Sequence, residues 1–122
     1  MKEYSLKLDY CNLLNLHKSL LEAKFHTVPD NKLVSRSPII ANIYIQIRDL
    51  LIEGDKGNGW IDWFKLSNRP DRRNQAICLM KKYELWSKET TDKKREIARN
   101  YLAPFLFDDE ELMNSLFRIV YP

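Results

Sequence analysis

Residues 37–54 read SPIIANIYIQIRDLLIEG, and this stretch decides the fold class of the chain. Ile43, Ile45 and Ile47 alternate with Tyr44 and Gln46, and β-branched side chains in alternation favour a strand. A helix is favoured over the strand because roughly sixteen residues without a breaker are long for a strand. We therefore predict a helix here and keep a strand over residues 39–47 as the alternative.

The two ends of this stretch carry helix signals. Ser37 can accept a hydrogen bond from an unpaired backbone N–H, and Pro38 has no N–H to lose at the first helical position. Gly54 is typical of the residue at which a helix ends. The expected buried face consists of Ile39, Ile40, Ile43, Ile47, Leu50 and Leu51.

Apolar residues recur at three- and four-residue steps on both sides of this segment. The pattern predicts further helices over residues 6–25, 60–66, 70–86, 92–103 and 108–120. With 122 residues, the chain has a common size for one domain. We expect a single all-α domain over residues 1–122, a compact bundle of five or six helices. The minor alternative is an α+β fold with short strands near residues 5–10 and 39–47.

Composition narrows the class of protein. Hydrophobic residues make up 44% of the chain and charged residues 30%, so the chain can form a packed core and is not of the disordered type. The sequence shows no signal-peptide core and no run near the roughly 20 apolar residues of a membrane span. We expect a cytoplasmic protein without a membrane partner. Cys11 and Cys78 are expected to be buried free thiols.

Charge is distributed unevenly along the chain. The net charge is +3, but residues 67–100 alone hold ten Lys or Arg against five Asp or Glu. This excess can form a positive face for a partner with an acidic surface. The alternative is an ordinary solvated surface whose charges pair locally.

No catalytic or metal-binding set is apparent. His17 and His26 are the two histidines, and neither has a Cys or His three or four residues away. The loop after residue 54 has the Asn-Gly spacing of a calcium-binding loop, but Lys56 and Lys65 stand where carboxylates are required. We predict no enzyme activity, no cofactor and no metal.

The segment over residues 60–82 has the layout of a helix-turn-helix. A short helix is followed by a turn and by a longer helix that begins with Arg, Asn and Gln, the side chains that pair with guanine and adenine edges. Lysines further along the chain could then contact phosphates. A sequence-specific DNA-binding regulator is therefore the alternative function, and two packed core helices with a basic end are the simpler structural interpretation.

Aromatic residues favour a different function. Trp60 and Trp63 lie one helical turn apart near the basic segment, and exposed Trp beside Arg is typical of protein-binding hot spots. We expect a small, non-catalytic inhibitor or regulator, similar in role to immunity proteins, antitoxins or phage inhibitors, that contacts a protein through residues 60–100. The candidate partner-binding residues are Trp60, Trp63, Arg69, Arg72, Arg73, Asn74, Gln75, Lys81, Lys82, Lys93, Lys94 and Arg95.

Overall fold

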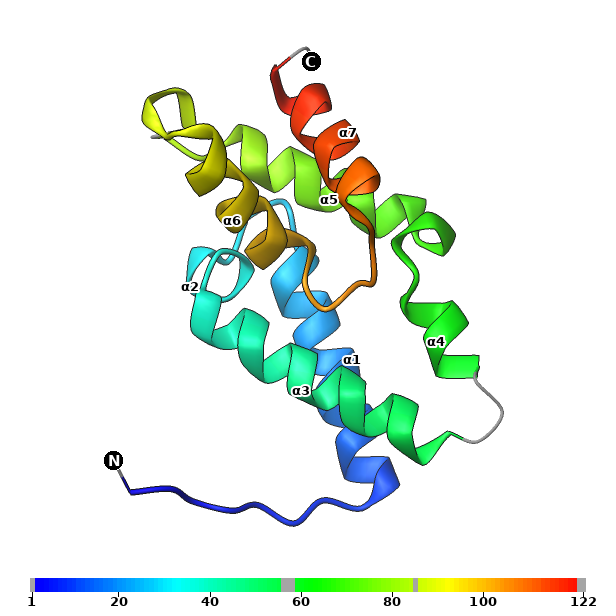
Figure 1. Cartoon of the computed structure of the whole chain (residues 1–122). Coiled ribbons are helices and arrows are strands. Elements are labelled where there is room, and N and C mark those ends of the chain that lie inside the picture. Colours follow the sequence, from blue (N-terminus) through cyan, green and yellow to red (C-terminus); the bar gives the residue numbers. More distant parts are fainter. Residues whose placement is uncertain (1, 56–58, 85, 121–122) are drawn as a thin grey trace.

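The computed structural model describes residues 2–55, 59–84 and 86–120, without the side chains of residues 117–120. Its α-helices are α1 (Tyr10–Phe25), α2 (Lys32–Ser35), α3 (Pro38–Gly54), α4 (Gly59–Phe64), α5 (Pro70–Lys81), α6 (Thr91–Leu102) and α7 (Asp109–Val120) (Figure 1). Short 3-10 turns follow α4 and α5, at Leu66–Asn68 and Trp86–Lys88. The fold is all-α, and the described residues contain no strand. None of the described helices combines the length and apolar character needed to cross a membrane.

Helix α3 confirms the helical prediction for the deciding stretch. The Ser37 hydroxyl accepts a hydrogen bond from the Ile40 backbone N–H at 3.2 Å, and the helix ends at Gly54. The predicted face is partly wrong, because Ile39, Ile43 and Leu50 are 72%, 43% and 55% exposed.

A rotation of the buried face explains this error. The residues that α3 buries are Ala41, Tyr44, Ile47 and Leu51. The Tyr44 hydroxyl lies 2.7 Å from the Nδ1 atom of His17, so a long-range polar contact turns this ring inward. Counting apolar residues alone cannot find a face that is centred on a tyrosine.

The other expected helices are present with shifted ends, and α2 is an addition. Helix α1 begins at Tyr10 because the Asp9 carboxylate accepts the Asn12 N–H at 2.8 Å and caps the helix. Residues 5–9 therefore precede the helix and form no strand. Helix α5 ends at Lys81, and Tyr83 and Trp86 lie in the following turn, both half-buried.

Asp108 and Glu111 cap the start of α7. The Asp108 carboxylate accepts the Glu111 backbone N–H at 2.8 Å, and the Glu111 carboxylate accepts the Asp108 N–H at 3.4 Å. This reciprocal pair satisfies two N–H groups at the helix start.

The helices pack as two groups that share one core. Helix α1 contacts both α2 and α3, and α5, α6 and α7 contact one another, while α1 packs on α5 and α3 packs on α6 (Figure 1). The core residues are Leu21, Phe25, Tyr44, Ile47, Leu51, Phe64, Leu66, Ala76, Ile77, Leu79, Met80, Ile97, Ala98, Tyr101, Leu102, Phe105, Leu112 and Leu116. Residues from both groups are needed to fill this core, so neither group buries its apolar faces alone.

A buried lysine joins the two groups. Lys24 of α1 is 1% exposed, and its Nζ donates hydrogen bonds to the backbone carbonyls of Ser35, Asn100 and Tyr101. Burial lowers the pKa of Lys24 to about 7, because the charged amine loses its hydration. The amine thus connects the end of α1 to the last turns of α2 and α6.

Both cysteines correct a prediction. Cys11 and Cys78 are free thiols, but both are exposed. Each lies on the solvent side of its helix, because the neighbouring residues that the core requires occupy the opposite side. In α5, for example, Ala76, Ile77, Leu79 and Met80 are buried around the exposed Cys78.

Candidate functional site

Helix α5 separates the candidate partner-binding residues into two groups. Those before α5 or in its first half are Trp60, Trp63, Arg69, Arg72, Arg73, Asn74 and Gln75. Those at its end or on α6 are Lys81, Lys82, Lys93, Lys94 and Arg95. A helix of this length spans about 18 Å, so the expected surface over residues 60–100 is divided between two ends of the molecule.

Two arginines of the first group, Arg69 and Arg72, have partners within the chain. The Arg69 guanidinium lies over the Trp63 ring, 4.5 Å from its centroid. Arg72 pairs with Glu22 of α1 at 3.2 Å and donates to the Gln75 amide oxygen at 3.2 Å. The first turns of α5 are thus connected to α1 and to the preceding helix.

The surroundings of α5 bear directly on the helix-turn-helix interpretation. Helix α5 packs against α1, α6 and α7, and a recognition helix needs an open face for the major groove. Of the expected base-reading set, Asn74 is exposed, whereas Arg72, Arg73 and Gln75 are half-buried. Direct readout would therefore require Arg72 and Gln75 to exchange their contacts for base edges.

Trp60 and Trp63 belong to an aromatic cluster around His17. The His17 ring lies edge-to-face against Trp60, Trp63 and Phe64, with centroid distances of 5.3, 4.9 and 5.4 Å. Both tryptophans are half-buried, so one side of each ring fills space under α1. His17 is 2% exposed, so it lies on the core face of α1.

The environment of His17 favours the neutral imidazole. Burial, followed by the charge of Lys18, lowers the pKa of His17 to about 4. The Tyr44 hydroxyl lies 2.7 Å from Nδ1 and 3.1 Å from the His17 carbonyl oxygen. Both contacts are satisfied when Nδ1–H donates to the hydroxyl and the hydroxyl donates to the carbonyl.

The second group of candidates lies where α5 ends and α6 begins. We call this region the basic end and define it by Lys81, Lys82, Lys88, Lys93 and Lys94. Four of these lysines are exposed, and Lys94 is half-buried. Figure 1 shows the end of α5, the following turn and the start of α6 at one corner of the molecule.

The basic end contains two aromatic rings, each of which is covered by a cation. The Lys94 amine lies 5.5 Å from the centroid of the Trp86 ring, and Trp86 packs edge-to-face against Tyr83 at 6.4 Å. The Arg36 guanidinium covers Tyr83 at 5.1 Å. Sequence reasoning did not include Arg36, Tyr83 or Trp86 in the site, and no local signal places the residue after α2 beside the turn after α5.

The acidic residues of this region leave part of its charge unpaired. Glu84 pairs with Lys32 at 3.0 Å and with Arg36 at 3.5 Å, and Lys93 pairs with Glu96 at 3.4 Å. A hydrogen bond from its own backbone N–H and then the one from Lys32 lower the pKa of Glu84 to about 2. Within the described part of the chain, Lys81 and Lys88 form no ion pair.

The described residues contain no cluster of side chains that could bind a metal ion. No three His, Cys, Asp or Glu side chains there lie close enough to hold a metal ion. Residues 56–58 of the glycine loop, with the Lys56 that argues against calcium, lie outside the described residues.

Comparison with known proteins finds no relative: no protein-family model, no curated protein and no solved structure matches the chain.

Proposed function

We propose that the chain is a small, non-catalytic inhibitor or regulator that binds an acidic surface of another protein through its basic end. The observation that carries the proposal is the group of exposed lysines where α5 ends and α6 begins, of which Lys81 and Lys88 are without an ion pair in the described structure. Lysines that contact carboxylates of a partner form charge-assisted hydrogen bonds with them. The attraction between the opposite charges also speeds association.

The rings at the basic end support a protein partner. Trp86 and Tyr83 are half-buried beneath Lys94 and Arg36, so an approaching surface meets cations on a firm aromatic base.

DNA binding through residues 60–82 would depend on different side chains. It requires Arg72 and Arg73 at base edges, whereas Arg72 pairs with Glu22 in the structure. The lysines of the basic end could contact phosphates in that case, so the two functions differ in which arginines are essential and in their dependence on salt.

A defined probe tests the proposal. A fluorescein-labelled polyglutamate peptide and a mixed-sequence DNA duplex are titrated at 50 and 200 mM salt, with fluorescence anisotropy as the readout. We expect the peptide to bind, and the combined variant Lys81→Glu, Lys88→Glu to raise its Kd at least about tenfold, because both variant positions then repel the peptide.

The matched control is Lys7→Glu combined with Lys18→Glu, which changes the net charge equally at exposed sites on the N-terminal part of the chain. Its Kd should stay within about twofold of the wild type. Equal losses in both double variants would reduce the effect to net charge and reject the basic end. Tighter binding of the duplex, abolished by Arg72→Glu with Arg73→Glu, would establish the DNA-binding function instead.

A further inference from the structure

Helix α3 carries a row of exposed, uncharged side chains on the side that faces away from the core. The row consists of Ile39, Ile43, Gln46 and Leu50, which follow one another at steps of four, three and four residues. Residues at these steps lie on one side of a helix, and the same spacing forms the contact between two helices of a coiled coil. We call this row the α3 stripe, and it is about 16 Å long.

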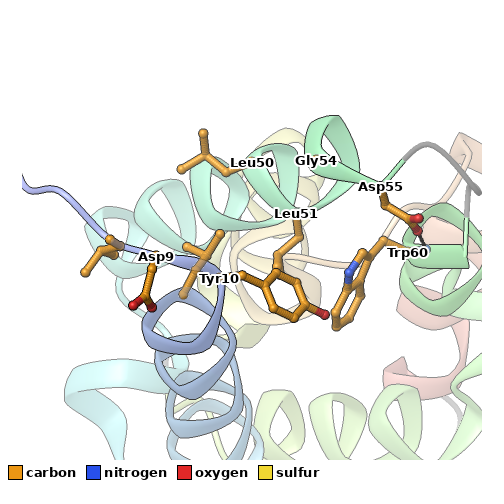
Figure 2. Close-up of a pocket in the computed structure, with 9 residues that line it drawn as sticks. Asp9, Tyr10, Leu50, Leu51, Gly54, Asp55 and Trp60 are labelled. Atoms are coloured by element: carbon orange, nitrogen blue, oxygen red, sulfur yellow. Dashed lines mark hydrogen bonds between the residues drawn. The ribbon is translucent and has the colours of Figure 1, made fainter.

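The α3 stripe lies outside the contacts that α3 makes within the chain. Helix α3 packs against α1, α4 and α6 with its other sides. A cavity of about 480 Å³ lies between the start of α1, the end of α3 and the start of α4 (Figure 2). Figure 2 shows Leu51 directed toward Tyr10 and Trp60, whereas Leu50 extends away from both rings. The stripe is therefore open to another molecule.

The N-terminal segment continues this apolar surface. Residues 2–9 are all exposed, and Figure 1 shows them as an uncoiled segment that leaves the start of α1 and runs apart from the helices. Tyr4 and Leu6 are 84% and 79% exposed, and Leu8 lines the same cavity as Leu50. Exposed apolar side chains thus extend from one end of the α3 stripe onto this segment.

The chain exposes more surface than is usual for a folded monomer of its size. Its accessible surface is 8076 Å², whereas a monomer of 14.6 kDa is expected to expose about 6,900 Å². The difference exceeds the roughly 800 Å² that each partner buries in a standard interface. Residues 2–9 contribute to it, so a partner that covers this segment together with the α3 stripe has enough area for a stable interface.

The start of α3 is basic. Lys32 and Arg36 precede its first turn, and both pair with Glu84, at 3.0 and 3.5 Å. One carboxylate shared by two cations leaves one positive charge on these three side chains. The first backbone N–H groups of a helix add partial positive charge at the same end.

The end of α3 is acidic. Asp49 and Glu53 are exposed in its last two turns, and Arg48 pairs with Asp49 at 2.9 Å. Glu53 forms no ion pair with the residues that the structure describes. Two copies of α3 therefore attract each other when they lie antiparallel, whereas parallel copies would place like charges together.

We propose that a second copy of the chain binds along the α3 stripe in antiparallel orientation and forms a symmetric dimer. The twofold axis passes midway between Ile43 and Gln46, so Ile39 faces Leu50 of the second copy and Ile43 faces its Gln46. Glu53 then lies toward the start of α3 in the second copy. A twofold interface uses the same surface on both copies, so one contact covers both stripes. The dimer does not depend on the proposed function, because none of the basic-end lysines takes part.

Sedimentation velocity of the full chain over a range of concentrations tests the dimer. We expect the fraction of dimer to rise with concentration. Ile43→Lys should raise the dimer Kd at least about tenfold, because it places two lysines at the centre of an apolar contact. A wild type that stays monomeric at every soluble concentration would overturn the proposal.

Met113→Lys is the matched control. Met113 of α7 is 39% exposed and Ile43 is 43% exposed, and both variants add the same charge. The control should leave the dimer Kd within about twofold of the wild type. Circular dichroism of both variants shows whether the fold is intact. Equal losses in the two folded variants, or no loss in Ile43→Lys, would reject the α3 stripe as the interface.

Charge reversal tests the antiparallel orientation. Glu53→Lys should raise the dimer Kd about fivefold, because the new lysine approaches the basic start of α3 in the second copy. Adding Lys32→Glu should restore most of the affinity, since the attraction is then reversed in sign and retained. Loss of the exposed pair between Lys32 and Glu84 costs little by itself. An unchanged Kd in Glu53→Lys, or no recovery in the double variant, would contradict the antiparallel dimer.

The N-terminal segment of the same chain is the alternative occupant of the α3 stripe. Leu6→Lys in the full chain, with the ¹H–¹³C resonance of the Ile43 δ1 methyl group as the readout, separates the two occupants. In the dimer, this resonance should move with protein concentration in the wild type. A resonance that is independent of concentration but moves in Leu6→Lys would assign the stripe to the chain's own N-terminal segment and overturn the proposal.

Discussion

The basic end and the pocket at the start of α1 combine aromatic rings and charged side chains in different ways. At the basic end, Lys94 and Arg36 cover the rings of Trp86 and Tyr83, so the surface presents cations. The pocket at the start of α1 is lined by Asp9, Tyr10, Asp55 and Trp60 among others, and its Tyr10 ring is mostly exposed. Helix α1 links the two, because it begins at Tyr10 and the Lys82 amine reaches Thr27 just beyond its end at 2.7 Å.

The separation of the two ends shows why net charge is a poor guide to partners. Sixteen helical residues span about 24 Å, which is more than two Debye lengths at physiological salt. The two ends therefore present separate surface potentials to a partner. The net charge of +3 is a sum over the whole chain and does not show where the charges lie.

The largest effect at pH 7 is expected at Lys24, whose amine connects α1 and α2 to α6. In Lys24→Met the carbonyls of Ser35, Asn100 and Tyr101 lose their donor in a buried site. We expect the free energy of unfolding at pH 7 to fall by about 3 kcal/mol, measured by urea denaturation.

Lys18→Met is the control, because Lys18 is exposed on the same helix. It should change the free energy of unfolding by less than about 0.5 kcal/mol. Equal stability of the two variants would show that the amine does not hold the groups together.

An effect of similar size, which appears only when the pH falls, is expected at His17. Its pKa of about 4 in the folded chain lies below the ordinary value of 6.5, so the unfolded chain binds the proton more readily between these values. The free energy of unfolding should therefore fall by about 3 kcal/mol from pH 7 to pH 4. Lys24, with a pKa of about 7, is protonated in both states over most of this range and contributes mainly above it.

His17→Gln, compared with the wild type by urea denaturation at each pH, should remove most of this slope. His26→Gln, at an exposed histidine, controls for the loss of one histidine. A slope that persists in His17→Gln would assign the acid sensitivity to the carboxylates.

The smallest effect is expected for the pair that holds Arg72. Glu22→Gln removes an ion pair whose acid is 75% exposed at its side chain, so the free energy of unfolding should change by less than about 0.5 kcal/mol. Arg72 then becomes available for other contacts. We expect the affinity for a DNA duplex to remain unchanged at 50 mM salt, and a clear gain would favour the helix-turn-helix function.

Much of the secondary structure could be predicted because it depends on neighbours within about four residues. Ser37 caps α3 by accepting the Ile40 N–H, and Asp108 caps α7 by accepting the Glu111 N–H. The buried set of α6, Ile97, Ala98, Tyr101 and Leu102, also matches its periodicity. These contacts are local, so their pattern is visible in the sequence.

The candidate site was less predictable because its contacts join distant parts of the chain. Residues 60–100 are continuous in sequence, but α5 carries them from the aromatic cluster at Trp60 to the lysines at the basic end. Arg36 contacts Tyr83 although α3, α4 and α5 lie between them in the sequence, and Asp9 and Asp55 line one pocket from before α1 and after α3. No periodic pattern in the sequence predicts either of these two sets of contacts.

The sequence by itself determined that the chain is helical, where most helices lie and that its lysines and arginines concentrate in residues 67–100. Only the tertiary structure decided which charges share a surface, which tryptophan faces are covered and that a buried Lys24 and His17 lie between the two ends. The physical reason is that helix formation is governed by backbone hydrogen bonds over one turn. Surface potential and burial depend on packing between segments that the sequence separates by dozens of residues.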